Sequence, residues 1–313
     1  MKFLSAEASA LALPSNSPER FTVVGLGELL WDMFPHGKQL GGAPANFAYM
    51  TALLGDRGIV ASRVGQDRLG QEAIWQLKSS GLDTSQIQLD PAHATGTVLV
   101  QVDSKGQPEY KITEDVAWDH LAWSAEWESL AKTAAAVCFG SLAQRSSTTR
   151  ATIRQFLRAV RPGAARIFDV NLRQAFFSAE ILRESALQAD IVKVNHEELP
   201  RIVELFGHKF VSESSAACWL SKEFAIKLVC VTRGARGSLL ISNEQRDEHP
   251  GFSVKVADTV GAGDAFTAAL VHHWLRRSPL SEMNLAANRM GAWVASQEGA
   301  MPTADEAVLS TIR

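Results

Sequence analysis

The stretch VADTVGAGDAF, residues 256–266, sets an aspartate on either side of a short run of small residues. The aspartates are Asp258 and Asp264, and the small residues are Gly261, Ala262 and Gly263. Glycine is costly in ordered structure, so its use here indicates an unusual backbone conformation or the close approach of a ligand. The residues that follow, GDAFTAALVHHWL (263–275), are predicted to form a helix.

The start of this predicted helix is suited to an anion. The first four N–H groups of a helix have no internal partner and carry the positive end of its dipole, and small residues leave them uncovered. Asp264 then has two interpretations. It caps the helix, a contribution of about 1 kcal/mol, or it is a general base for a hydroxyl that receives a phosphoryl group held by the amides.

Composition describes an ordinary globular chain. Of its 313 residues, 46% are hydrophobic and 21% are charged. This is sufficient for a sizeable core, and a single α/β domain often reaches this length. The formal net charge of -3 and the isoelectric point near 6.3 predict no nucleic-acid or membrane partner held by bulk charge.

Cysteine usage and the first residues bear on location. The cysteines are odd in number and far apart: Cys138, Cys218 and Cys230. This pattern argues against a disulfide framework or a zinc site and favours a reducing compartment. We interpret residues 1–20 as a flexible tail, because Glu7 interrupts the apolar part that a signal peptide needs. No run approaches the ~18 apolar residues of a membrane span, so we expect a cytoplasmic protein.

From Phe21 onward, short apolar runs alternate with helical periods. The predicted strands are FTVVG (21–25), GIVAS (58–62), AAAVCFG (134–140), RIFDV (166–170), DIVKV (190–194) and KLVCVT (227–232). Between them, TTRATIRQFLRAV (148–160) and GQEAIWQLKSSG (70–81) repeat apolar residues at helical spacing, and Gly81 is placed as a C-terminal cap. Such alternation predicts βαβ units and a mainly parallel sheet covered on both faces.

Two segments interrupt the alternation. TGTVLVQVDSKGQPEYKIT (95–113) predicts two strands around a turn at 103–106, and GELLWDMFPHGKQLGG (27–42) lacks a helical period. We expect a small β lid built from about 27–42 and 96–118. No linker or repeat divides the chain, so we predict one domain over 21–313 after the tail. Exposed edges of the lid are candidates for pairing two chains into a homodimer.

Several common motifs are absent. The chain has no G-x-x-x-x-G-K-[ST] loop, no H-E-x-x-H pair and no protein-kinase signature. The G-x-G at Gly25 and Gly27 follows a predicted strand, but Leu30 takes the third glycine position of a dinucleotide fingerprint.

The two most specific motifs, DTVGAGDAF (258–266) and GGAPANFA (41–48), resemble the paired signatures of the ribokinase-like (PfkB) sugar kinases. Further segments follow in the order of that family: SRVGQDRLG (62–70), TGTVLV (95–100), DVNLR (169–173), NHEEL (195–199), VTRGARGS (231–238) and EGAMP (298–302). The resemblance implies a three-layer α/β/α fold and an ATP-dependent sugar kinase. Bacterial fructokinases are the most similar members, although this chain has Ala175 and Phe177 where they often carry proline and tryptophan.

The resemblance assigns catalytic roles. It implies that Asp264 is the base and that the amides of Gly261, Ala262 and Gly263 form the anion hole. Arg173 would face the transferred phosphoryl group, where its charge offsets developing negative charge. From the residues alone, Arg173 could instead pair with Asp169.

Two ion sites are implied in the same way. Asn195 and Glu198 would orient the water shell of Mg²⁺ on the ATP phosphates, since magnesium keeps several waters. By spacing alone they also form a capping box. Asp258 would help hold K⁺, with carbonyl ligands from Val260 and residues 294–303, unless its carboxylate only satisfies loop amides.

The remaining implied roles concern the substrates. The sugar side would comprise Asp32, Gly42, Asn46 and Asp67 together with Asp264. The alternatives to sugar binding are structural roles: a helix-terminus hydrogen bond for Asn46 and a helix cap for Asp67. The nucleotide side would comprise Thr232, Gly234, Gly237, Asn288 and Gly291, together with Asn195, Glu198, Gly261 and Gly263.

We therefore predict transfer of the γ-phosphoryl group of MgATP to a primary hydroxyl, O6 of fructose. The alternatives within the family are 2-keto-3-deoxygluconate kinase, ribokinase and a nucleoside kinase. A non-catalytic sugar-binding relative is the alternative from another class.

Overall fold

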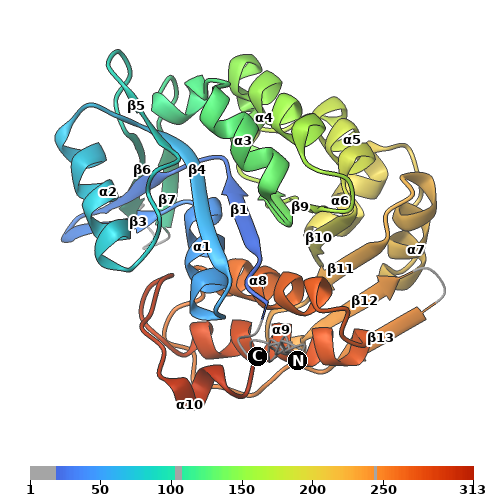
Figure 1. Ribbon diagram of the computed structural model, residues 1–313. Coiled ribbons are helices and arrows are strands. Elements are labelled where there is room, and N and C mark those ends of the chain that lie inside the picture. Colours follow the sequence, from blue (N-terminus) through green and yellow to red (C-terminus); the bar gives the residue numbers. More distant parts are fainter. Residues whose placement is uncertain (1–18, 103–107, 243–244) are drawn as a thin grey trace, which may run out of the picture.

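The computed structural model describes residues 19–102, 108–242 and 245–313 (Figure 1). The tail expected over 1–20 and the turn expected at 103–106 fall almost wholly outside these ranges.

A nine-stranded sheet forms the middle layer, in the order β13-β12-β11-β10-β9-β8-β1-β4-β5. The strands are β1 (Thr22–Leu26), β4 (Arg57–Gly65), β5 (Ile87–Asp90), β8 (Ala136–Phe139), β9 (Ala165–Asp169), β10 (Ile191–Asn195), β11 (Leu228–Thr232), β12 (Ser238–Ser242) and β13 (Gln245–His249). In this sheet, every pair of neighbouring strands from β11 through β10, β9, β8, β1 and β4 to β5 is parallel, as the alternation predicted. The antiparallel edge of β12 and β13 was not predicted, because QRDEH in β13 lacks the apolar alternation of a strand.

Helices cover both faces of this sheet (Figure 1). One layer contains α1 (Ala43–Leu53), α2 (Arg68–Ser79), α8 (Ala262–Leu275) and α9 (Leu280–Ala295). The other contains α3 (Ala125–Thr133), α4 (Ser147–Ala159), α5 (Ala179–Gln188), α6 (Glu198–Leu205) and α7 (Glu213–Glu223). Alternate residues of β1 point into separate cores. Val23 packs with the layer that contains α1 and α8, and Val24 packs with the layer that contains α3 to α7. The expected three-layer α/β/α fold is confirmed.

Glycines in two neighbouring strands let α1 lie directly on the sheet. A Cβ on Gly58 would lie 1.9 Å from the carbonyl oxygen of Ala48, and one on Gly25 would lie 2.1 Å from that of Pro44. Any larger residue would push α1 away. This close contact positions the start of α1, which belongs to the site described below.

A separate four-stranded sheet has the order β3-β2-β6-β7. Its strands are β2 (Leu30–Phe34), β3 (Gly37–Gly41), β6 (Gly96–Val102) and β7 (Pro108–Ile112). The two segments predicted to be β-rich therefore pair, through the parallel contact of β2 with β6. The indole N–H of Trp31 donates to the carbonyl of Leu69 at 3.0 Å and ties this small sheet to α2.

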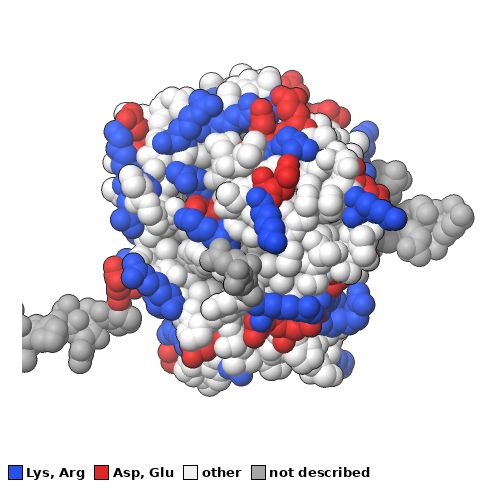
Figure 2. Space-filling view, turned by 90° about the vertical axis from the view of Figure 1, so that its right-hand side faces the viewer, with Lys and Arg blue, Asp and Glu red and all other residues white. Residues whose placement is uncertain are grey.

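The part of the chain that the structure describes has no helix both long and apolar enough to cross a membrane. On the face shown in Figure 2, basic and acidic side chains are interspersed over the surface.

Candidate active site

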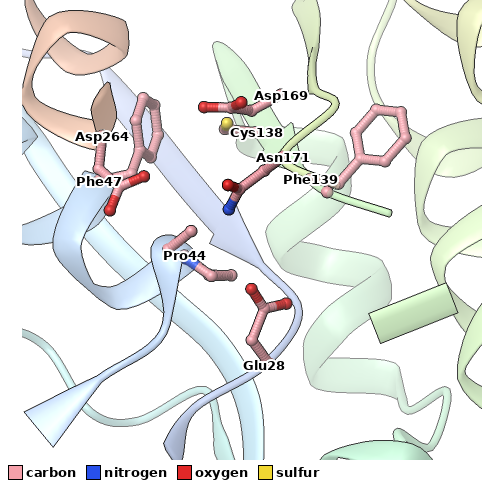
Figure 3. Close-up of a pocket in the computed structure, with 10 residues that line it drawn as sticks. Glu28, Pro44, Phe47, Cys138, Phe139, Asp169, Asn171 and Asp264 are labelled. Atoms are coloured by element: carbon pink, nitrogen blue, oxygen red, sulfur yellow. The ribbon is translucent and has the colours of Figure 1, made fainter. Parts of the chain in front are cut away.

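A pocket opens at the carboxyl ends of the central strands (Figure 3), where open α/β sheets generally bind ligands. Glu28 follows β1, Gly140 follows β8 and Asn171 follows β9. Helix α1 contributes Pro44 and Phe47, and α8 contributes Asp264. The topology thus gathers into one pocket groups from far apart in the chain.

Asp264 lies in the first turn of α8 and contacts α1. The side-chain amide of Asn46 donates to Oδ2 of Asp264 at 2.8 Å. Burial raises the pKa of Asp264 to about 6, the negative charge of Asp169 adds to this, and the Asn46 hydrogen bond opposes it. A carboxyl group with this pKa can accept a proton near neutral pH.

The turn before Asp264 has the backbone that its glycines suggested. Gly261 is the N-cap of α8 with φ of 77°, in the left-handed region, and as a glycine it contributes no capping side chain. The described side-chain bond of Asp264 goes to Asn46, so capping does not explain this carboxylate. The first amides of α8 therefore lie beside Asp264 with no side-chain cap, although the predicted donor Ala262 directs its N–H to the Thr259 carbonyl at 3.3 Å.

We expect Gly261→Ala to damage turnover far more than stability. A left-handed alanine costs roughly 1–2 kcal/mol, and its Cβ would lie 2.7 Å from the Ala300 Cβ. The turn must shift, and a displacement of about 1 Å at a reacting centre costs about 10²-fold in rate. The measurement is kcat, with Gly163→Ala as the control, because Gly163 also has positive φ but open space around it. Equal activity of the two variants would contradict this role.

A buried ion pair that the sequence reasoning missed lies beneath the turn. The Lys193 ammonium contacts both carboxylate oxygens of Asp169, at 3.0 and 3.1 Å, and both residues are buried. A Cβ on Gly263 would lie 3.1 Å from Lys193 Nζ. Burial lowers the Lys193 pKa, but the negative charges of Asp169, Glu198 and Asp264 together outweigh burial and leave that pKa raised. A lysine inside the apolar strand DIVKV was the available signal.

Glu28 was also missed. It is 3% exposed, and its Oε2 has no hydrogen-bond partner among the described residues. Burial raises its pKa to about 7, and the charge of Arg173 opposes the shift. A buried carboxyl oxygen without a hydrogen-bond partner is costly, so its presence in a pocket points to a partner that is not part of the chain.

Arg173 and Asp32 face the same region. Burial raises the pKa of Asp32 to about 6, and Arg173 lowers it. The positive charge of Arg173 also acts on Glu28 and Asp264, so one guanidinium serves all three carboxyl groups. The alternative pairing of Arg173 with Asp169 is not seen: Arg173 is exposed and donates to the Leu172 carbonyl, while Asp169 pairs with Lys193.

Two further sugar-side residues have local structural roles. Gly42 is the N-cap of α1 with φ of 111°, and a Cβ there would lie 2.5 Å from the carbonyl oxygen of Glu28. Asp67 caps α2 through the Gly70 N–H at 2.8 Å and accepts from the Thr95 N–H and hydroxyl, both at 2.7 Å. Both oxygens of Asp67 are thus occupied by the protein, which favours the capping interpretation.

Asn195 and Glu198 form the reciprocal contacts of a capping box. The Asn195 side chain accepts from the N–H groups of Glu197 and Glu198, at 2.9 and 2.8 Å. Glu198 in turn accepts from the N–H of Asn195 at 2.9 Å and of Leu172 at 2.8 Å. This carboxylate therefore ties the segment carrying Arg173 to the end of β10.

The proposed nucleotide residues lie around β11 and α9. Thr232 pairs with Asn195 across neighbouring strands, while Gly234 and Gly237 bound a tight turn before β12. Asn288 is buried and donates to the Ser238 hydroxyl at 2.7 Å, which attaches α9 to β12. Gly291 allows α9 to approach α8, since a Cβ there would lie 3.1 Å from the Ala262 carbonyl oxygen.

Asp258 connects the turn to the segment after α9. Its carboxylate accepts from the Val260 N–H at 3.0 Å and the Gly299 N–H at 3.3 Å. The loop-amide interpretation is therefore realised. The geometry also brings 258–260 beside the start of 294–303, as the implied K⁺ site requires, because the Ala257 N–H donates to the Ala295 carbonyl at 2.9 Å.

A model of the pfkB family of carbohydrate kinases matches residues 29–307. Fructokinase-1 of Oryza sativa subsp. japonica is 31% identical over 307 residues, which cover 90% of this chain and 94% of the relative. The chain belongs to the pfkB family.

Solved structures agree with this assignment. A sugar kinase of Pyrococcus horikoshii in complex with ATP has 29% identity and a TM-score of 0.72, over 90% of this chain and 93% of the other. The fructokinase of Vibrio cholerae O395, in a form with fructose, ADP and calcium ion bound, has 26% identity and a TM-score of 0.76, over 94% and 98%.

Proposed function

We propose that this protein transfers the γ-phosphoryl group of ATP to O6 of fructose. The observation that carries the proposal is the Asp264 carboxylate, held by Asn46 beside the α8 amides in a pocket with an unpaired carboxyl group. The bound ligands of the Pyrococcus and Vibrio structures support ATP and fructose as substrates.

The residues of the chain would divide the work as follows. Asp264 accepts the proton of the attacking hydroxyl as the phosphoryl group moves onto that oxygen. The amides of Gly261, Ala262 and Gly263 stabilise the negative charge on the transferred group. Arg173 and the buried Lys193 add positive charge that acts on Asp264. Most of the catalysis is therefore positioning and charge stabilisation.

Magnesium bound to ATP would supply positive charge that offsets the negative charge of the phosphates. The donor set of Asn195 and Glu198 fits this ion as a support for its water shell, since magnesium takes few protein ligands. Their oxygens are already occupied by backbone N–H groups, which is compatible with an outer position. Asp258 and the carbonyls near Val260 are our candidates for K⁺.

We further propose that the small sheet closes over the sugar. Asp32 on β2 would accept hydrogen bonds from sugar hydroxyls, with Gly42 and Asn46 at the start of α1. Closure would exclude water and so suppress ATP hydrolysis. A cytoplasmic location and a homodimer paired through this sheet remain predictions.

Glu28→Leu should weaken sugar binding without destabilising the fold. We expect the KM for the sugar to rise about 10–100-fold, the loss expected for a hydrogen bond of about 1.5–3 kcal/mol to a charged group. The thermal midpoint should rise, because leucine removes an unpaired buried carboxyl group. The KM for ATP serves as the internal control. An unchanged sugar KM would show that Glu28 does not contact the sugar.

A coupled ADP-release assay tests the proposal. The panel is fructose, ribose, 2-keto-3-deoxygluconate, adenosine and glucose, each with MgATP. We expect the highest kcat/KM on fructose. A higher kcat/KM on another acceptor would support the proposed kinase activity but show that fructose is not the preferred substrate. No turnover with any acceptor, while MgATP or a sugar binds by calorimetry, would favour the non-catalytic alternative.

A further inference from the structure

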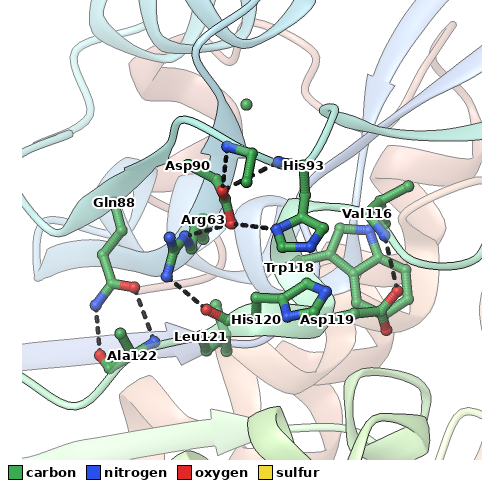
Figure 4. A network of polar contacts seen from close by, with 12 residues as sticks. Arg63, Gln88, Asp90, His93, Val116, Trp118, Asp119, His120, Leu121 and Ala122 are labelled. Carbon is green, nitrogen blue, oxygen red and sulfur yellow. Dashed lines mark hydrogen bonds and ion pairs between the residues drawn. The ribbon is translucent and has the colours of Figure 1, made fainter.

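Two histidines and an aspartate meet where the small sheet joins the main body, outside the residues that line the pocket. His93 lies in the connection from β5 to β6, and Asp115 and His120 lie in the connection from β7 to α3. One ligating atom from each of these residues lies within 4.8 Å of the others. Figure 4 shows the rings of His93 and His120 next to each other, with Asp90 beside His93.

Asp90 fixes the orientation of His93. Its Oδ2 lies 3.0 Å from His93 Nδ1 and 2.9 Å from Arg63 Nε. Backbone N–H groups of Ala92 and His93 hold Oδ1 at 2.8 and 3.1 Å. Nδ1 of His93 therefore carries the proton, and the lone pair of Nε2 remains for another partner. Metal-binding histidines are held by carboxylates in this same arrangement.

Asp115 lies near the Nε2 atoms of both imidazoles. Its Oδ1 lies 2.9 Å from His120 Nε2 and 3.9 Å from His93 Nε2. Around a tetrahedral ion with bonds of about 2.0–2.1 Å, ligand atoms lie roughly 3.3 Å apart, which is between these two separations. The rings now stack at 3.5 Å, and one must turn to aim its lone pair at the ion. The His120 side chain is 31% exposed, so its ring is partly open to solvent.

We propose that His93, Asp115 and His120 bind a first-row divalent transition metal of the Zn²⁺ type. Two imidazole nitrogens and one carboxylate oxygen suit Zn²⁺, Co²⁺ and Ni²⁺ rather than Mg²⁺ or Ca²⁺. The ion takes the place of the proton between His120 Nε2 and Asp115, and a neutral His120 then carries its one ring proton on Nδ1. The Asp115 carboxylate is 80% exposed, so water can complete the coordination.

The position of the site gives the ion a structural consequence. The β6–β7 hairpin is entered through 91–95 and left through 113–116. Backbone contacts already join these connections, for example the Ala117 N–H to the Ala94 carbonyl at 2.8 Å. An ion bound to His93 and Asp115 would add a cross-link at the same place and restrain the hairpin relative to the main sheet.

The test is titration of the full-length, chelator-treated protein with Zn²⁺ by calorimetry and with Co²⁺ by visible absorption. We expect one ion per chain, Co²⁺ bands typical of low coordination number, and a higher thermal midpoint with Zn²⁺. His93→Gln and His120→Gln should each weaken binding at least 10-fold. His36→Gln, which removes an exposed histidine of the small sheet, should leave binding unchanged.

Asp115→Asn provides a second measure, because it keeps the shape of the side chain while removing the charge. It should weaken Zn²⁺ binding with no loss of thermal midpoint in the absence of metal. Absence of saturable binding in the wild type would overturn the proposal. Binding that His36→Gln removes, or that survives both His93→Gln and His120→Gln, would overturn it as well.

Discussion

Asp264→Asn is expected to reduce kcat by about 10²–10⁴-fold, the usual contribution of a positioned general base. Asparagine retains the size of the side chain and an oxygen that can accept from the Asn46 amide, so the local structure should persist. The substitution removes only the ability to take the proton. The measurement is steady-state ADP release with the sugar saturating, together with calorimetric binding of ATP.

The matched control is Asp305→Asn. Asp305 also lies at a helix start, where it caps α10 (Glu306–Leu309) through the Val308 N–H at 2.9 Å. We expect wild-type turnover from it. If Asp264→Asn retains wild-type kcat, Asp264 is not the base, whatever its geometry.

The Asp264 carboxyl group is also expected to set the pH dependence of kcat/KM. The base acts as a carboxylate, and its pKa is raised to about 6. The value of kcat/KM should therefore be constant well above pH 6 and fall tenfold per pH unit well below it. A flat profile from pH 5 to 8 would contradict this assignment.

Lys193→Met is expected to cause a large loss of stability. It leaves the buried carboxylate of Asp169 without its partner, and breaking one side of a buried pair costs about 3–5 kcal/mol. Thr267 contacts the same carboxylate at 3.2 Å but supplies no charge. The measurement is the free energy of unfolding in urea.

Two variants control for this interpretation. Lys227→Met breaks the more exposed pair with Asp190 and should cost at most about 1 kcal/mol. The double variant Lys193→Met/Asp169→Asn should recover part of the loss, because no buried charge remains unpaired. A loss no larger than that of Lys227→Met would show that the pair is not stabilising.

Lys193→Met also has a kinetic readout. Lys193 lowers the pKa of Asp264, whereas Asp169 raises it. Without the lysine, the acid limb of the kcat/KM profile should move to higher pH. If the Lys193–Asp169 pair were purely structural, the acid limb of the kcat/KM profile would not move.

Much of the fold could be predicted because each strand of the parallel part is a short apolar run. The edge strand β13 escaped prediction because its residues are polar and exposed, and its place depends on pairing with β12. The small sheet was anticipated as two β-rich segments. The pairing of β2 with β6 joins residues far apart in sequence, which no local pattern specifies.

The candidate site divides in the same way. The sequence was enough to name Asp264, Asn46 and the left-handed Gly261, because each lies within a short, continuous motif. Glu28 could not be named, because its importance depends on burial and on what surrounds it in the folded chain. Lys193 gave one signal, a lysine inside an apolar strand, but the sequence does not show that Asp169 is its partner. Asp67 and Asn288 were assigned to ligands by resemblance, and in the structure their polar atoms contact neighbouring protein groups.

The most direct test of the proposed function is to identify the product formed from ¹³C-labelled fructose and MgATP by ³¹P and ¹³C NMR. We predict a phosphomonoester on C6, with one ADP formed per sugar phosphate, and no such product from Asp264→Asn. Phosphate on another carbon would contradict the predicted acceptor hydroxyl. Conversion of ATP to ADP and inorganic phosphate, with no phosphorylated sugar from any acceptor of the panel, would contradict the account as a whole.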